Sequence, residues 1–338
     1  MVKEMNNPRL ASGELGPTVC VGEILVEIIA TAAGNGFLKP MSLAGPYPSG
    51  APAVFINQCA RIGGTSAMIG AVGDDDFGRV NTDRLKRDGV ITSGIVVDPE
   101  FPTGSAFLRY RHDGSRDFIY NIATSAAARF SWSDNVKSLI RKCGHLHVMG
   151  STLSMPSAWV VIEKAVDIIK QRGGTLSFDP NLRKELKYDN ETVRRFEWIV
   201  SHTDLLLPSG EELERAANMC SKSAKDEAVA VSTLFELGIG EIALKRGAKG
   251  ATCYRVGQPQ IDTPAFVVEE LDPTGAGDCF GGAYVTCRRL GLEPADALLY
   301  ANAAGARNVT VRGPMEGAGT RAELDLFISQ TQQQTLCK

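Results

Sequence analysis

The alternation of strand-like and helical segments constrains the fold of this chain more than any other feature. Between residues 133 and 244 we expect strands at 145–149, 175–178, 203–207 and 241–244, and helices at 133–141, 156–171, 190–200, 210–218 and 225–237. Such alternation implies right-handed βαβ units. We therefore predict an α/β fold, a doubly wound and largely parallel sheet with helices on both faces. Ligands in that architecture bind at the carboxyl ends of the strands.

The chain begins this pattern with an almost continuously apolar segment, residues 18–29, which we interpret as the first buried strand. Glu23 and Glu27 interrupt it. A carboxylate near the end of a buried strand is unfavourable unless it is paired or functional, so Glu27 is a candidate ligand residue. A salt-bridged structural glutamate is the alternative. Residues 1–16 are polar and aperiodic, and we expect a loose leader there.

A predicted β insert interrupts the alternation. Residues 107–110 and 117–122 flank a turn that contains Asp113-Gly114, a typical hairpin signal. Together with the Gly- and Pro-rich residues 31–48, this hairpin is expected to form a small second sheet. We predict one domain over residues 17–335, with lid inserts at about 31–48 and 103–128, and the lid is also a natural dimer contact.

One glycine-rich stretch stands where a helix is expected to begin. Asp272-Pro273-Thr274-Gly275-Ala276-Gly277-Asp278 follows an apolar, strand-like run at residues 266–268 and precedes a helical segment. A helix start offers unpaired N–H groups, and glycines let an anion approach them closely. An acid just after such a nest, at Asp278, suits general-base chemistry on a hydroxyl that attacks a phosphoryl group. The alternative is a glycine-rich loop that only turns the chain.

Other polar groups follow the predicted strands. Asp179, Asn181 and Arg183 come directly after one of them; Arg183 suits a substrate oxygen or a phosphate, or else Asp179 and Asn181 simply satisfy backbone donors in a turn. Glu212 begins a helix, where it either complements the helix dipole or organises Mg²⁺ through water. Gly50 opens another helix and provides a second potential nest.

Composition excludes several classes of partner. The 338 residues carry a net charge of -3, and Lys and Arg are scattered, so neither nucleic acid nor a membrane is expected as a partner. The eight cysteines form no Cys-x-x-Cys pair, and the start of the chain lacks a signal-peptide-like apolar stretch, which predicts a cytoplasmic protein. The first strand is followed by neither a Walker A nor a Gly-x-Gly-x-x-Gly motif.

The stretch at 272–278, together with Cys279-Phe280-Gly281-Gly282-Ala283-Tyr284, resembles the carboxy-terminal signature of the ribokinase-like (PfkB) family of carbohydrate kinases. Four further segments occur in the order that the family shows: Gly22-Glu23-Ile24-Leu25-Val26-Glu27, Gly50-Ala51-Pro52-Ala53, Asp179-Pro180-Asn181-Leu182-Arg183 and Arg246-Gly247-Ala248-Lys249-Gly250. The resemblance extends over residues 18–330.

The resemblance implies roles for these residues. Asp278 would be the catalytic base, and the N–H groups of Gly275, Ala276 and Gly277 the anion hole. The donor would be ATP with Mg²⁺, and in some relatives a monovalent cation assists. The ATP-binding residues would be Lys245, Gly247, Gly250, Thr274, Gly275 and Gly277, and the sugar site would use Glu27 and Gly50. Two lids commonly associate into a homodimer in this family.

The chain also departs from the family pattern. Val54 replaces the usual Asn, for which Asn57 is a candidate substitute, and Ser209 replaces the Asn of an Asn-x-x-Glu motif, which weakens the Mg²⁺ role of Glu212. The pattern is closest to 2-keto-3-deoxygluconate, tagatose and fructose kinases.

Tyr120 stands in the lid, but the Tyr-x-Arg of the sugar-acid kinases is Tyr120-Asn121-Ile122 here. We therefore predict a neutral keto-sugar of the tagatose or fructose type as substrate, with the sugar acid second. A catalytically silent sugar-sensing protein of the same fold is the alternative from another class.

Overall fold

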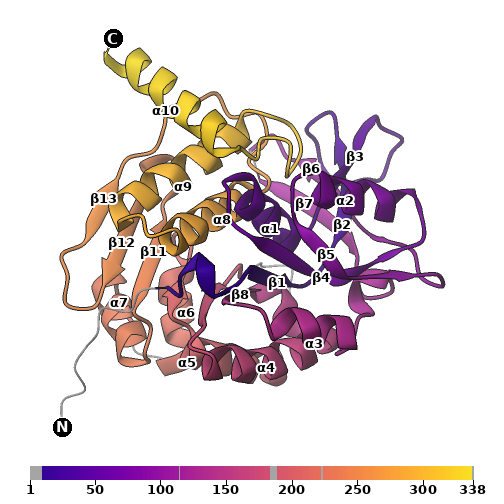
Figure 1. Ribbon diagram of the computed structural model, residues 1–338. Coiled ribbons are helices and arrows are strands. Elements are labelled where there is room, and N and C mark those ends of the chain that lie inside the picture. Colours follow the sequence, from indigo (N-terminus) through magenta and orange to yellow (C-terminus); the bar gives the residue numbers. More distant parts are fainter. Residues whose placement is uncertain (1–9, 114, 183–188, 222–223, 337–338) are drawn as a thin grey trace.

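A nine-stranded sheet forms the centre of the molecule (Figure 1), in a computed structural model that describes residues 10–113, 115–182, 189–221 and 224–336. The strand order is β13-β12-β11-β10-β9-β8-β1-β4-β5. Pairing is parallel from β11 to β5, and β12 and β13 add antiparallel strands at one edge. The bounds are β1 (Thr18–Val21), β4 (Ser66–Gly73), β5 (Ile91–Asp98), β8 (His145–Met149), β9 (Thr175–Asp179), β10 (Leu205–Leu206), β11 (Glu241–Lys245), β12 (Ala251–Arg255) and β13 (Ile261–Thr263).

Helices cover both faces of this sheet, as the alternation predicted. The core on one face includes residues of α1 (Ala51–Arg61), α2 (Asp76–Arg87), α8 (Ala276–Arg289), α9 (Pro294–Val309) and α10 (Arg321–Leu336). The other face is covered by α3 (Asp134–Ile140), α4 (Pro156–Gln171), α5 (Asn190–His202), α6 (Glu212–Ser221) and α7 (Glu227–Glu236). Strand β1 contributes to both cores, because Val19 and Val21 face one and Cys20 the other.

A second sheet of four strands confirms the predicted small β insert. Its order is β3-β2-β6-β7, with β2 (Leu25–Ala30), β3 (Leu43–Ser49), β6 (Gly104–Tyr110) and β7 (Arg116–Asn121). We call these four strands the lid sheet. It stands at the carboxyl end of β1, because only three residues separate β1 from β2.

The expectation of one strand over residues 18–29 was wrong. The chain leaves the main sheet after Val21 and enters the lid sheet at Leu25. Gly22 marks the break: a Cβ there would lie 2.5 Å from Pro52 Cγ and 2.6 Å from Thr152 Cγ2, so no larger residue fits. Glu27 therefore belongs to the lid sheet and not to the end of the first central strand.

Two smaller expectations also fail. Residues 266–268 do not form a strand, although they are apolar. Residues 10–16, which we expected in a loose leader, are held by Arg289, which donates to the carbonyl oxygens of Ala11 (2.9 Å), Ser12 (3.0 Å) and Gly16 (2.8 Å). Within the described part of the chain, none of the helices has the length and apolar character needed to cross a bilayer.

Candidate active site

A cavity of about 630 Å³ opens between the lid sheet and the carboxyl ends of the central strands. Most of the sequence-predicted strand-end candidates gather here. Its lining includes Glu27, Ser49, Ala51 and Val54, Arg116 and Phe118 of β7, Asp179, Glu212 and Lys245, and the stretch Pro273, Thr274, Gly275, Gly277 and Asp278. The position agrees with the rule that ligands bind at this end of a doubly wound sheet.

The glycine-rich stretch forms the start of α8, as predicted. Gly275 is the N-cap in the left-handed conformation (φ 80°), and a Cβ on it would lie 2.4 Å from the carbonyl oxygen of Pro314. Ala276, Gly277 and Asp278 make the first turn; Ala276 N donates to Pro273 O at 3.4 Å, and the first N–H groups of a helix have no acceptor within it. The backbone therefore presents N–H donors and the positive end of the helix dipole to the cavity, with the Asp278 carboxylate beside them.

Lys245 lies opposite this helix start. Its ammonium donates to Asp179 Oδ2 at 2.5 Å, and a Cβ built on Gly277 would lie 3.6 Å from Lys245 Nζ. Burial lowers the pKa of Lys245, but the neighbouring carboxylates Asp179 and Glu212 raise it by more, so Lys245 carries its charge. The first cavity is thus lined both by the start of α8 and by the charged Lys245, which suits an anion.

Glu212 is fixed by two backbone bonds. Its Oε1 accepts from Leu182 N (2.7 Å) and its Oε2 from Ser209 N (2.8 Å). Burial, and then the charge of Asp179, raise the pKa of Glu212, with Lys245 opposing. Glu212 therefore has a structural role at the start of α6 and also adds negative charge at the cavity.

A second cavity of about 380 Å³ adjoins the first and shares Lys245, Pro273 and Gly277 with it. It is more apolar, and four of the predicted ATP residues, Lys245, Gly247, Gly250 and Gly277, line it. The rest of its lining comes from Ala248, from Ala265, Phe266, Val267, Val268 and Glu270, from Ala276 and Phe280 of α8, and from Asn302, Gly305, Ala306 and Val309 of α9. Two ligands bound in these cavities would meet at the start of α8.

The sugar-side candidates differ in their positions. Glu27 is 7% exposed and accepts from Ser49 Oγ at 2.8 Å, facing the first cavity. Gly50 is the N-cap of α1, between the lining residues Ser49 and Ala51. Asn57 was predicted wrongly: its side chain is buried and donates to Asp88 Oδ2 at 2.8 Å, whereas Val54 lines the cavity.

The lid contributes residues that the sequence reasoning missed. Tyr120 is not part of the cavity lining; its ring stacks on Phe118, with 5.2 Å between centroids, and Phe118 faces the cavity. Arg116, on the same face of β7, also lines the cavity. The alternation of residues 116, 118 and 120 was the available signal. Arg183 lies outside the described residues.

His145 and His147 of β8 are buried structural residues. His145 is 2.8 Å from both Thr175 Oγ1 and Ser177 Oγ, and His147 is 2.7 Å from Ser177 Oγ. Burial lowers the pKa of both imidazoles. Among the residues that the structure describes, His, Cys, Asp and Glu form no group of three or more suited to a metal ion.

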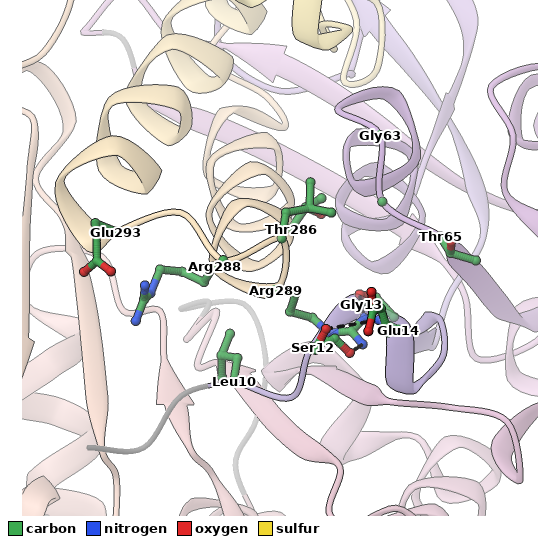
Figure 2. Close-up of a pocket in the computed structure, with 14 residues that line it drawn as sticks. Leu10, Ser12, Gly13, Glu14, Gly63, Thr65, Thr286, Arg288, Arg289 and Glu293 are labelled. Atoms are coloured by element: carbon green, nitrogen blue, oxygen red, sulfur yellow. Dashed lines mark hydrogen bonds between the residues drawn. The ribbon is translucent and has the colours of Figure 1, made fainter. Parts of the chain in front are cut away.

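A third cavity, of about 440 Å³, includes Thr18 at the start of β1 and so lies at the opposite end of the sheet (Figure 2). Figure 2 shows Arg288 pointing toward Glu293 and Arg289 toward Ser12 and Gly13. Arg288 pairs with Glu241 at 2.9 Å. None of the predicted site residues lies here, and the first two cavities form the candidate active site.

Comparison with known proteins agrees with this geometry. The model of the pfkB family carbohydrate kinases matches residues 18–321. The chain belongs to this family. Fructokinase-1 of Oryza sativa subsp. japonica is 30% identical over 316 residues, which cover 90% of this chain and 95% of that protein.

Solved structures give the same result. An E. coli protein provisionally named ribokinase II is 43% identical in its apo form, with a TM-score of 0.87 over 93% of this chain and 99% of that one. A structure of an E. coli protein of the same provisional name, in complex with ATP and Mg²⁺, is 42% identical over the same shares, with a TM-score of 0.85. The predicted family, fold class and carbohydrate-kinase activity are thereby confirmed.

Proposed function

We propose that this kinase transfers the γ-phosphoryl group of ATP to a primary hydroxyl of a neutral keto-sugar of the fructose or tagatose type. The observation that carries the proposal is the meeting of two cavities at the start of α8, with Asp278 facing the polar one. The fructokinase relatives and the ATP-bound neighbour support the choice of sugar class and donor.

In the proposed mechanism, the sugar lies in the first cavity against Glu27, and the nucleotide lies in the second against Gly247 and Gly250. Asp278 accepts the proton of the attacking hydroxyl as its oxygen bonds to the γ-phosphorus and the bond to the bridging oxygen breaks. The N–H groups of residues 275–277 stabilise the charge on the transferring group.

Mg²⁺ would enter with ATP and neutralise charge on its phosphates. Asp179 and Glu212 offer carboxylate oxygens at the cavity, but Asp179 is already paired with Lys245, and Glu212 already accepts from two backbone N–H groups. These residues therefore fit a cation that is held mainly by phosphates and water, and not one enclosed by protein ligands. A monovalent cation near the anion hole stays a prediction.

The test is ADP release with ketohexoses, 2-keto-3-deoxy sugar acids, ribose and nucleosides, for the wild type and for Asp278→Asn. We expect a fructose-type sugar to give the highest kcat/KM, and Asp278→Asn to lower kcat by about 10²–10⁴ because proton acceptance is lost. Sugar binding, measured by calorimetry, should be nearly unchanged. The control is Asp134→Asn, a fully exposed carboxylate on α3. Near-normal turnover of Asp278→Asn would refute its role as the base.

A sugar acid is the second candidate, and Arg116 favours it. This guanidinium lines the sugar cavity and could bind a carboxylate. If the substrate is neutral, Arg116→Ala should change kcat/KM less than about threefold. If it is an acid, losing a charged hydrogen bond should cost about 10-fold or more. Arg111→Ala, which removes a half-exposed arginine of the same hairpin paired with Asp117, is the control.

Two further predictions concern context. We place the enzyme in the cytoplasm, which is supported by the free thiols of the seven described cysteines, Cys20, Cys59, Cys143, Cys220, Cys253, Cys279 and Cys287. A homodimer formed through the lid sheet also stays a prediction. Sedimentation of the purified protein tests it.

A further inference from the structure

One residue of the lid sheet reaches the loop that precedes α8. Tyr110 is the last residue of β6, and its hydroxyl lies 2.5 Å from Asp272 Oδ1 and 3.0 Å from Thr274 Oγ1. Burial, and then the bond to Asp272, raise the pKa of the Tyr110 phenol, so the hydroxyl stays protonated and donates to the carboxylate. The lid is thereby joined directly to the stretch that forms the anion hole.

Asp272 connects three parts of the chain through one carboxylate. Besides the Tyr110 hydroxyl, its Oδ1 accepts from Thr274 N (3.0 Å) and its Oδ2 from Gly313 N (2.9 Å). Asp272 is 1% exposed, and none of the ion pairs among the described residues includes it. A buried carboxylate without a cation depends on each of its neutral donors.

The same links bear on the position of Gly275. Thr274 directly precedes it, and Gly313 directly precedes Pro314, whose carbonyl oxygen would lie 2.4 Å from a Cβ on Gly275. The carboxylate of Asp272 therefore binds the backbone on both sides of the turn that starts α8, at Thr274 and at Gly313. The backbone of Tyr110 also fastens the other lid insert, because its carbonyl oxygen accepts from Gly34 N at 2.9 Å.

We propose that Tyr110 is a positioning residue which, through Asp272, couples the placement of the lid to the alignment of the anion-hole N–H groups. It touches neither substrate in this scheme. When the lid is seated, the Tyr110 hydroxyl completes the donor set of Asp272 and fixes residues 274 and 275. This inference rests on the proposed anion-hole role of residues 275–277.

The test is Tyr110→Phe, which keeps the ring and removes only the hydroxyl. We expect kcat to fall about 10–100-fold, while the KM for the sugar changes less than threefold, because the sugar contacts stay in place. Tyr300→Phe is the matched control: the Tyr300 hydroxyl also donates to a carboxylate, Asp325, but between α9 and α10 on the surface. Tyr300→Phe should have the kcat of the wild type. The Tm of both variants should lie within a few degrees of the wild-type Tm.

A double-mutant cycle separates positioning from general packing. Because Tyr110 acts through Asp272, the variant carrying both Tyr110→Phe and Asp272→Asn should be no slower than Asp272→Asn alone, within about threefold. Additive losses, an effect confined to the KM, or a Tyr110→Phe enzyme as fast as Tyr300→Phe would each overturn the inference. Wild-type activity on the sugar panel reports separately on the proposed function.

Discussion

Gly275 and Gly277 at the start of α8 differ in whether the backbone itself requires a glycine. Gly275 has a left-handed backbone and no room for a Cβ against Pro314. Gly277 has an ordinary helical backbone, and a Cβ there would only come into van der Waals contact with Lys245, 3.6 Å from Nζ. The turn itself therefore requires glycine at 275 but not at 277.

This difference gives a prediction for Gly275→Ala. The added Cβ must displace Pro314 or twist the turn, so the N–H groups of 275–277 lose alignment, and we expect kcat to fall about 10²–10³-fold, as when an oxyanion-hole donor is removed. Gly257→Ala is the control, since Gly257 also has a positive φ (69°) but nothing within 4 Å of its Cβ position. ADP release measures both. Equal activity of the two variants would contradict the steric argument.

At the residue scale, the sequence predicted the start of α8 better than the lining of the polar cavity. Asp278 and the glycines could be placed because their local order already defines a helix start. Asn57 could not, since its orientation depends on which face of α1 meets Asp88. Arg116 was missed because its approach to the cavity depends on how the lid sheet is seated over the strand ends.

At the scale of elements, β1 and β2 show where apolar periodicity is insufficient. A continuous apolar run predicts buried strand, and both halves are buried, but they belong to different sheets. Gly22 was the available signal for the break, and its tight contact with Pro52 and Thr152 is a tertiary feature that the sequence does not reveal. The consequence for the site is that Glu27 reaches the cavity from the lid sheet and not from the central sheet.

Capping explains why other boundaries were predictable. Asp75 accepts from Gly78 N at 2.8 Å at the start of α2 and so caps this helix. Ser133 and Asp189 cap α3 and α5 in the same way. Such signals are local in sequence. The bond that Glu212 accepts from Leu182 N, 30 residues away in a loop, is not local.

At the scale of the whole molecule, a buried ion-pair network joins segments that are distant in sequence. Asp88 accepts from Arg84 Nε at 2.6 Å and from Arg61 Nη1 at 3.1 Å. Arg84 also pairs with Glu316 at 3.0 Å and donates to Met315 O at 2.6 Å. The network therefore ties α1 and α2 to residues 315–316, directly after the Pro314 that supports Gly275.

The last prediction concerns Asp88→Asn, which should lower the free energy of unfolding by about 1.5–3 kcal/mol at neutral pH, the range for hydrogen bonds to charged groups. Burial raises the pKa of Asp88, but Asn57, Arg84 and Arg61 lower it by more, so its folded pKa lies below the ordinary 3.8. A carboxylate whose folded pKa is lowered stabilises the fold at pH values above its unfolded pKa, and this contribution disappears as the pH falls through the folded pKa.

The difference in the free energy of unfolding between wild type and Asp88→Asn, measured in urea, should therefore be full above about pH 5 and shrink below about pH 4. Asp76→Asn, an exposed carboxylate on the same helix paired with Arg79, should show little change at any pH. A pH-independent difference would mean that Asp88 acts through packing and not through its charge.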